Sequence, residues 1–261
     1  MPGEPWLILP TYNEAENVQA IVAASAEVLA GAAPDGFRVL IVDDGSPDGT
    51  GRLADQMATE HEWLQVLHRT EKNGIGPAYL AGFRHALDHG AGYVMEMDSD
   101  FSHDPDALPT VLAPLGEGYE VCIGSRYVPG GSIPNWSLPR RLLSRGGNVY
   151  ADLALGLHVR DSTAGYRAYA ATLLRRIELD SVRAESYGFQ IEMTYRARRL
   201  GASVKEVPIR FVDRELGTSK MSTYTVVEAL ALVTWWGLSR LAGRLGPRRT
   251  AASPTRSSAP R

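Results

Sequence analysis

The sequence has a single cysteine among 261 residues. A disulfide within the chain and a zinc site built from several cysteines are therefore both excluded. The one thiol, Cys122, lies in the apolar run EVCIG at 120–124. We expect it to be a small core residue and not a nucleophile, because a buried thiol behaves as a small hydrophobic group.

Long hydrophobic runs, a targeting segment and a strong net charge are also missing. No stretch reaches 18 uninterrupted apolar residues, so the sequence predicts no transmembrane helix. The N-terminal MPGEPWLILP lacks the basic and long apolar parts of a signal peptide. The net charge of −3 gives no reason to expect a nucleic-acid partner. We expect a cytoplasmic protein that is soluble or peripheral on the cytoplasmic face of a membrane.

Apolar runs alternate with helical patterns through the first hundred residues. Strands are expected at 6–9, 38–42, 64–68 and 93–97, and helices at 14–29, with Asn13 as N-cap, at 50–60 and up to about 89. This alternation predicts right-handed crossovers, and hence an α/β fold with a Rossmann-like, mostly parallel sheet and flanking helices.

The second half is less regular. We expect helices at 107–115, 137–156, 185–200 and 224–245, strands at 121–123 and 204–212, and polar loops at 161–169 and 213–222. The last segment, 247–261, has nothing to bury and is expected to be disordered.

The stretch YVMEMDSDFSHDP at 93–105 carries the strongest chemical signal. Its apolar run ends in Asp98 and Asp100, and acids at i and i+2 on an extended chain point to the same side. Ligands of open α/β sheets bind at the carboxyl ends of the strands. Mg²⁺ takes one or two carboxylates together with substrate phosphates. A cation site is one interpretation, and an acidic surface turn is the other.

Polar residues also follow the first and second expected strands. Asn13 and Glu14 come after the first, and Asp43 and Asp44 end the second. If these strands are neighbours of the strand that leads to Asp98, their ends form one carboxylate-rich rim. Several strands that end in acids are harder to attribute to chance than one, so the cation site is favoured.

A set of further motifs matches a known family. They are PTYNE (10–14), VDDGSPDGT (42–50), MDSDFSHDP (97–105), GSRYVPGG (124–131), NW (135–136), DSTAGYRAY (161–169), YGFQIEM (187–193) and VDRELGTSKMS (212–222). With them the chain resembles the polyprenyl-phosphate (dolichyl-phosphate) mannose synthases of glycosyltransferase family 2. The first three are specific for the superfamily, whereas GSRYVPGG and the R-x-x-G-x-SK loop are typical of the polyprenyl-phosphate branch.

The resemblance implies a GT-A nucleotide-diphospho-sugar transferase fold at 1–223. It also implies an amphipathic, interfacial helix at 224–246 that associates with a membrane, followed by the disordered tail at 247–261. The family motif often reads DxTSGFR, whereas this chain has DSTAGYR at 161–167. These two departures concern the sugar preference and not the fold.

The resemblance also implies roles for individual residues. The base and ribose would be held by Pro10, Tyr12, Glu14, Val42 and Asp44. The ribose, metal and diphosphate would be surrounded by Asp98, Ser99 and Asp100, with both aspartates as ligands of Mg²⁺ or Mn²⁺ and Asp100 as the direct one. Phosphates would be contacted by Arg126, Arg214 and Lys220, and the lipid phosphate by Arg140, joined by Arg141. The catalytic set is then Asp98, Asp100, Arg126, Arg214 and Lys220.

The implied reaction is inverting transfer of mannose from GDP-mannose to a polyprenyl (dolichyl) phosphate. Its product would serve lipid-linked glycan or glycoprotein synthesis. Another donor such as UDP-glucose, or nucleotide-sugar binding without turnover, stay open as alternatives. A Rossmann dehydrogenase is excluded because no G-x-G-x-x-G follows the first strand.

Four smaller questions stay open at this point. The basic face with Arg140, Arg141 and Arg145 is either solvated or binds phosphate. His103 is expected in a turn or behind the metal ligands, and Glu192 is either a surface acid or a sugar contact. The loop at 213–222 is expected to close over the donor.

The segment at 224–245 is expected to lie on the membrane surface, because its apolar residues recur at helical spacing beside Trp235 and Trp236. A helix packed on the protein's own core is the alternative. A membrane-anchored partner protein is a further possibility.

Overall fold

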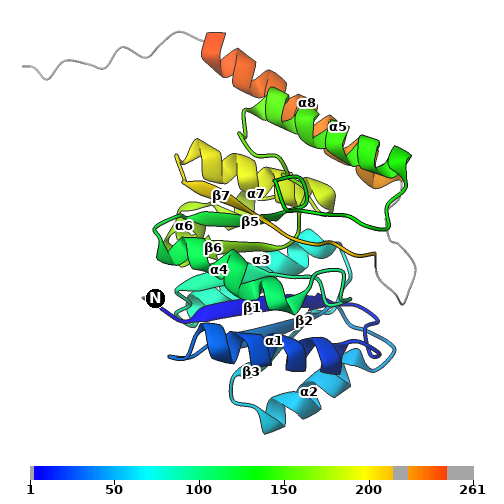
Figure 1. Ribbon diagram of the computed structural model, residues 1–261, viewed down its shortest axis with the longest axis vertical. Coiled ribbons are helices and arrows are strands. Elements are labelled where there is room, and N and C mark those ends of the chain that lie inside the picture. The colour runs from blue at the N-terminus through cyan, green and yellow to red at the C-terminus, as the bar shows by residue number, and fades with distance from the viewer. Residues whose placement is uncertain (1–2, 214–222, 246–261) are drawn as a thin grey trace, which may run out of the picture.

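The computed structural model describes residues 3–213 and 223–245 (Figure 1). Its centre is one seven-stranded sheet in the order β3-β2-β1-β4-β6-β5-β7. The strands are β1 (Pro5–Thr11), β2 (Arg38–Asp43), β3 (Leu64–His68), β4 (Tyr93–Glu96), β5 (Val121–Ser125), β6 (Arg167–Ala170) and β7 (Val204–Pro208). Only β6 runs against its neighbours among these strands. The predicted α/β fold with a mostly parallel sheet is confirmed.

Helices cover both faces of the sheet. They are α1 (Val18–Ala32), α2 (Thr50–Glu60), α3 (Ile75–Asp88), α4 (Leu108–Gly116), α5 (Leu138–Leu155), α6 (Ala171–Arg176), α7 (Tyr187–Arg199) and α8 (Thr223–Leu245), with 3₁₀ turns η1 (Pro105–Ala107) and η2 (Leu179–Ser181). Alternate side chains of β1 pack on opposite faces of the sheet. Trp6 and Ile8 join the core cluster with α3, α6 and α7, whereas Leu7 and Leu9 join the one with α1 and α4. Because both faces are covered, the strand is apolar throughout.

Three boundaries differ from the sequence-based expectation. The predicted loop at 161–169 contains the start of β6, which pairs with both β4 and β5. A four-residue strand that begins with arginine is too short to show the periodicity from which a strand is predicted, so the sequence indicates a loop here. Helix α1 begins at Val18 and not at residue 14, because Asn13 adopts a left-handed φ of 59° and cannot act as its N-cap. Strand β7 ends at Pro208, and only isolated bridges continue to Phe211.

Helices α5 and α8 pack together beyond α7, at one end of the molecule (Figure 1). They run in the same direction, because Tyr150 Oη lies 2.7 Å from Thr234 Oγ1 and Ala154 lies against Gly237 one turn later. On the other side of α8, the Trp236 ring stacks on Tyr195 of α7 at 6.1 Å. Within the described residues, no helix has the length and hydropathy needed to cross a membrane.

Helix α3 approaches the sheet closely at Gly82. A Cβ at this position would lie 2.5 Å from Ile8 Cγ2 and 3.2 Å from Val42 Cγ2. Gly31 in α1 is exposed and has no atom within 4 Å of the same point. The absence of a side chain therefore matters at Gly82 and not at Gly31.

We predict that Gly82→Ala lowers the free energy of unfolding by about 1–2 kcal/mol, because overpacking outweighs the gain in helix propensity. Gly31→Ala is the matched control and should leave stability unchanged or slightly raised. Urea unfolding followed by circular dichroism measures both. Equal midpoints for the two variants would contradict the close packing described here.

Candidate functional site

The carboxyl ends of β2, β1 and β4 lie side by side, as the sequence predicted. Pro10 of β1 pairs with Val42 of β2, and Ile8 pairs with Glu96 of β4. The polar residues that follow these strands therefore meet at one edge of the sheet. The structure confirms the shared rim on which the sequence argument depended.

Two loops at this rim are joined by hydrogen bonds from main-chain amides. The amide of Asn13 donates to Ser46 Oγ at 3.0 Å, and the amide of Glu14 donates to Thr50 Oγ1 at 2.9 Å. The left-handed conformation of Asn13 is what turns these amides toward the second loop. The predicted nucleotide-side residues of the two motifs thus sit on one connected support.

Basic residues that the sequence argument did not single out lie on the same side. Arg69 Nη1 contacts Asp44 Oδ1 at 2.6 Å, and Lys72 Nζ lies 3.6 Å from the centre of the Tyr12 ring. Burial raises the pKa of Asp44, and Arg69 opposes this shift. The available signal was the run HRTEK directly after the third predicted strand, which places cations at the same edge.

The acidic motif is not a surface turn. Asp100 and Ser99 are buried, and Asp98 is half-buried. Ser99 Oγ donates to the carbonyl of Pro10 at 2.8 Å, and Asp100 Oδ1 accepts the amide of Ser102 at 3.0 Å. The segment is therefore fixed to β1 with its two carboxylates at the rim.

These carboxylates fit a cation that arrives with a diphosphate. No group of three or more His, Cys, Asp or Glu side chains in the described residues is arranged to hold a metal by itself. Two aspartates supply the hard oxygen ligands that Mg²⁺ and Mn²⁺ accept, and phosphate oxygens commonly complete such a site. Asp98 and Asp100 would hold the ion.

His103 lies behind the carboxylates. Its Nε2 is 3.8 Å from Asp98 Oδ2, and its ring packs against Tyr166 and Phe211. Burial lowers the pKa of His103 to about 4, so the ring is neutral at pH 7. The ring therefore lies beside Asp98, behind the carboxylates, at the position expected from the sequence.

A further carboxylate, that of Glu96, lies directly beneath the rim. Glu96 is fully buried and accepts a hydrogen bond from Gln190 Nε2 at 2.7 Å. Burial raises the pKa of Glu96 to about 7, although nearby Arg167 favours the charged form. Tyr79 Oη donates to Asp98 at 3.3 Å in the same layer. Glu96 gives no functional signal in the sequence, because it lies at the end of an apolar strand.

Arg126 is held by a buried partner. Its guanidinium reaches both oxygens of Asp161, at 2.7 Å and 2.6 Å, and also Thr163 Oγ1 at 2.8 Å. Burial would raise the pKa of Asp161, but Arg126 holds it below the ordinary value. The pair is neutral overall, and the predicted phosphate contact of Arg126 stays a prediction.

Arg140 occupies a defined position and is not part of a simply solvated face. Its Nη1 contacts Asp213 Oδ2 at 2.8 Å, and its guanidinium lies 4.0 Å above the Trp136 ring. Trp136 Nε1 donates to the other oxygen of Asp213 at 2.9 Å. Arg141 instead holds the carbonyl of Ile133 at 2.6 Å, and Arg145 is exposed. The predicted phosphate residues Arg214 and Lys220 lie outside the described residues.

Glu192 is not a surface acid. It is buried, it accepts the amide of Ala184 at 3.0 Å, and it forms an ion pair with Arg196 at 2.7 Å. Protein donors occupy both carboxylate oxygens, so this residue connects α7 to the preceding loop.

Comparison with known proteins places these features in context. The profile of glycosyl transferase family 2 matches residues 6–178. An undecaprenyl-phosphate mannosyltransferase of Micrococcus luteus is 49% identical over 243 residues, which cover 92% of this chain and 98% of that protein. A polyprenol monophosphomannose synthase of Mycolicibacterium smegmatis is 47% identical over 244 residues, covering 93% and 89% respectively.

Solved structures share the fold at lower identity. A glucosyl-3-phosphoglycerate synthase of Mycobacterium tuberculosis, in complex with Mn²⁺, UDP-glucose and glycerol 3-phosphate, has a TM-score of 0.61 at 19% identity, covering 93% of this chain and 80% of that one. A mannosyl-3-phosphoglycerate synthase of Rubrobacter xylanophilus has a TM-score of 0.63 at 17% identity, covering 97% and 78%. The GT-A architecture is thus confirmed.

The pKa of Glu96 predicts how stability changes with pH. Because the folded-state pKa is raised to about 7 from 4.5, the folded protein binds more protons than the unfolded chain between these values. The Glu96 contribution to stability therefore falls as the pH rises through this window. Glu96→Gln removes this pH dependence. The free energy of unfolding of the variant should therefore rise by about 2 kcal/mol relative to that of wild type between pH 5 and pH 8. Urea unfolding at both pH values measures this difference, and parallel pH profiles would contradict the assignment.

Proposed function

Because the chain belongs to glycosyl transferase family 2, we propose that it transfers mannose from GDP-mannose to a polyprenyl phosphate with inversion at the sugar. The product, a polyprenyl-phosphate mannose, would serve lipid-linked glycan or glycoprotein synthesis. The names of the two relatives at 49% and 47% identity support the sugar and the acceptor.

One observation of the structure carries this proposal. A row of aromatic rings connects the acidic motif with Arg126 and Arg140, whose guanidinium groups both lie over the Trp136 ring. His103 lies 5.2 Å from Phe211, Phe211 lies 5.7 Å from Trp136, and Trp136 carries Arg140. Carboxylates that suit a metal diphosphate and cations that suit a second anion are thus held side by side. A transferase that joins two anionic substrates needs both.

On the donor side, the joined loops after β1 and β2 would bind the nucleoside. Tyr12 and Asp44 face the base and ribose in this proposal, together with Pro10, Glu14 and Val42. Arg69 Nη1 lies 2.6 Å from Asp44 Oδ1, and this ion pair keeps the Asp44 carboxylate oriented. A divalent cation held by Asp98 and Asp100 would stabilise the negative charge on the leaving diphosphate. Arg214 and Lys220, on the loop at 213–222, would add positive charge as the loop closes.

On the acceptor side, a phosphate oxygen forms the new bond to the anomeric carbon while the bond from that carbon to the diphosphate breaks. The second pKa of a phosphate monoester is about 6, so this nucleophile is largely ionised at neutral pH. A strong general base is therefore unnecessary. The protein instead has to bring two anions together, and Arg140 and Arg126 would do this through charge-assisted hydrogen bonds.

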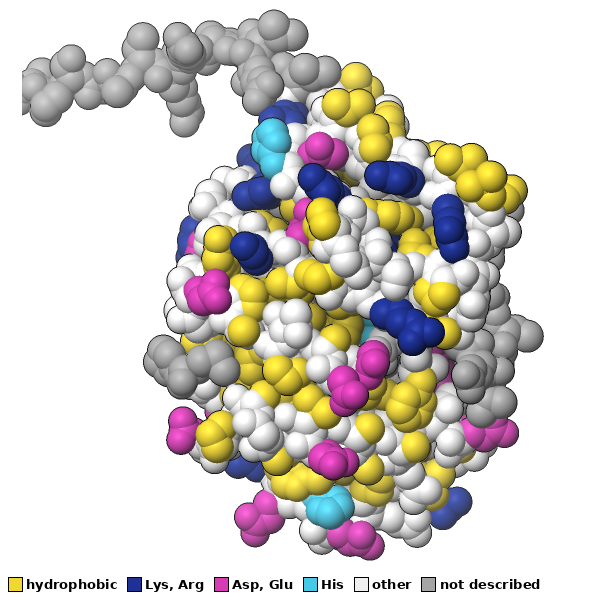
Figure 2. All heavy atoms as spheres, in the orientation of Figure 1, with side chains coloured by type: hydrophobic (Ala, Val, Ile, Leu, Met, Phe, Trp, Pro, Cys, Tyr) yellow, Lys and Arg dark blue, Asp and Glu magenta, His cyan; other side chains and the backbone are white. Residues whose placement is uncertain are grey.

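The acceptor chain is too apolar to leave the bilayer, so we place the enzyme on the cytoplasmic face of a membrane. Large exposed hydrophobic side chains gather on α5 and α8: Leu138, Leu142, Leu143, Val149, Tyr150, Leu153, Leu230, Trp235 and Leu238. Figure 2 shows hydrophobic and basic side chains together at this end of the molecule. The sequence argument placed the contact on α8 alone. Val233 and Trp236 pack inward, so α8 exposes only one side. The exposed residues of α5 extend this surface, and the two helices share it.

A direct assay tests the proposed reaction. Purified protein is incubated with polyprenyl phosphate in detergent and with radiolabelled GDP-mannose, UDP-glucose or other nucleotide sugars, and the lipid is extracted. We expect labelled lipid from GDP-mannose, and only with Mg²⁺ or Mn²⁺ present. Asp100→Asn should lower the rate at least about a hundredfold, because it weakens a metal ligand. The exposed Asp106 supplies the matched control, Asp106→Asn.

Three results would overturn parts of the proposal. Glucolipid formed from UDP-glucose in preference to mannolipid would change the donor. Full transfer in excess chelator would remove the metal from the mechanism, and binding of GDP-mannose without any product would indicate a protein that binds nucleotide sugars without turnover.

Arg140 should act mainly on the acceptor. We predict that Arg140→Ala raises the KM for polyprenyl phosphate about tenfold and leaves the KM for GDP-mannose nearly unchanged, because one charged hydrogen bond is lost. Arg140→Lys should restore part of the effect, since it keeps the charge. Arg52→Ala, an exposed position on α2, is the control. A change confined to the donor KM would show that Arg140 belongs to the nucleotide side.

A further inference from the structure

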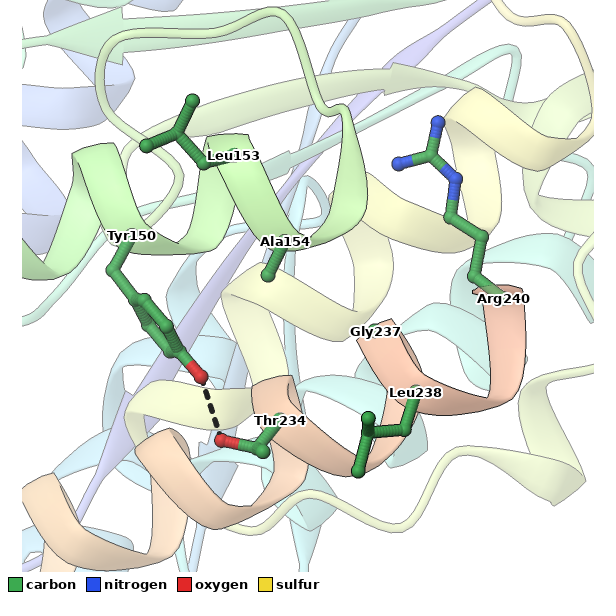
Figure 3. A pocket seen from close by; sticks show the side chains of 7 residues that line it. All are labelled: Tyr150, Leu153, Ala154, Thr234, Gly237, Leu238 and Arg240. Atoms are coloured by element: carbon green, nitrogen blue, oxygen red, sulfur yellow. Dashed lines mark hydrogen bonds between the residues drawn. The ribbon is translucent and has the colours of Figure 1, made fainter. Parts of the chain in front are cut away.

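Two adjoining hollows lie where the C-terminal parts of α5, α7 and α8 meet. The first, of about 250 Å³, is a groove between α5 and α8 with Leu153 and Leu238 on its walls (Figure 3). The second, of about 430 Å³, is lined by Arg198, Arg199 and Arg240. Arg240 lines both, so the apolar groove leads directly to the basic hollow.

The three arginines face no carboxylate in this hollow, because none of its lining residues is acidic. Arg198 is committed to the protein, since its Nε donates to the carbonyl of Leu157 at 2.6 Å. Arg199 lies over the Tyr195 ring at 5.7 Å. Among the side chains that the structure describes, none forms a hydrogen bond or an ion pair with Arg199 or Arg240. Two guanidinium groups are therefore available at one place.

A purely structural role explains only part of this arrangement. Arginine near a helix C-terminus offsets the helix dipole and binds the last carbonyl groups. Arg198 does this for the segment that follows α5. Arg240 packs against the chain at Gly156, where a Cβ would lie 2.5 Å from its Nη1. Because Gly156 has no side chain, the Arg240 guanidinium fits at the mouth of the hollow. This packing leaves the N–H groups of Arg240 able to donate to a ligand.

The surface around the groove is suited to a bilayer. Leu153 is 78% exposed, Trp235 69% and Leu238 60%. Tryptophan and leucine beside arginine are typical of segments that lie at the membrane interface. Anionic lipids attract such basic positions, each by about 1 kcal/mol.

This place is remote from the catalytic rim. Arg140 and Asp213, which the aromatic row connects to the acidic motif, lie at the start of α5, whereas the basic hollow lies at its end. An 18-residue helix is about 26 Å long. The acceptor phosphate cannot occupy both positions at once, so an anion bound in the hollow would be a different one.

We propose that the hollow binds the phosphate of an anionic membrane phospholipid, with an acyl chain along the groove between α5 and α8. The proposal deepens the membrane part of the proposed function and rests on it. Arg199 and Arg240 hold the phosphate, and Leu153 and Leu238 contact the chain. The far end of α5 is thereby fixed to the bilayer, in addition to the acceptor site near its start.

Vesicle binding by the full chain tests this site. Wild type should bind phosphatidylcholine vesicles more tightly once phosphatidylglycerol is added. Arg199→Gln and Arg240→Gln should each reduce the affinity for the anionic vesicles about fivefold, and leave binding to pure phosphatidylcholine unchanged. Leu153→Ser should weaken binding to both kinds of vesicle. Arg52→Gln removes one exposed charge elsewhere and should change neither.

Each contrary result has a definite meaning. An equal loss for Arg52→Gln and Arg240→Gln would reduce the effect to net charge and overturn the site. Wild-type binding that ignores phosphatidylglycerol would also overturn it. If soluble glycerol 3-phosphate displaced the protein from the vesicles at similar affinity, the hollow would be a site for free phosphate.

Mannose transfer in detergent, measured on the same variants, separates this proposal from the proposed function. Normal transfer by Arg199→Gln and Arg240→Gln shows that they are folded, and impaired transfer would place these residues in the acceptor site instead. No transfer by wild type, with vesicle binding as expected, would overturn the reaction and leave the lipid site standing.

Discussion

The burial of Arg167 is the constraint on which the candidate site depends. Its guanidinium has no contact with solvent and donates to the carbonyls of Ser162 and Ala164 at 2.7 Å and to Thr194 Oγ1 at 2.7 Å. A buried charge is tolerated only when its donors are all satisfied. The loop that carries Asp161 and the helix α7 are therefore tied to β6, and β6 places them beside the acidic motif.

Much of the rim could be predicted because it follows from strand order. Acids after separate strands fall on one edge whenever those strands are parallel neighbours. The pairing of β1 with β2 and with β4 meets that condition. The positions of Asp44, Asp98 and Asp100 could be predicted without side-chain geometry, because each follows the end of an apolar run in the sequence.

The remainder of the site depends on contacts that no local pattern encodes. Arg126 was expected to face a phosphate, yet its bidentate partner Asp161 lies 35 positions away. Arg167 lay inside a segment expected to be a polar loop, although it is fully buried in a strand. In both cases the residue type alone suggested that the arginine faces solvent or a ligand. Whether an arginine is structural or functional depends on its partners in the fold, which the sequence does not show.

On the proposed membrane surface, arginines at the two ends of α5, one of them contributed by α8, would give this end of the protein a defined orientation. Arg140 at the start of the helix lies beside the catalytic rim, and Arg240 packs against Gly156 just past its end. One basic contact would let the protein rotate about that point, whereas two contacts separated by a helix of about 26 Å fix a line. The exposed leucines of α5 would then set which side of that line faces the lipid. The candidate site would thereby be held at a constant height above the bilayer, where a phosphate attached to a membrane-embedded chain could reach it.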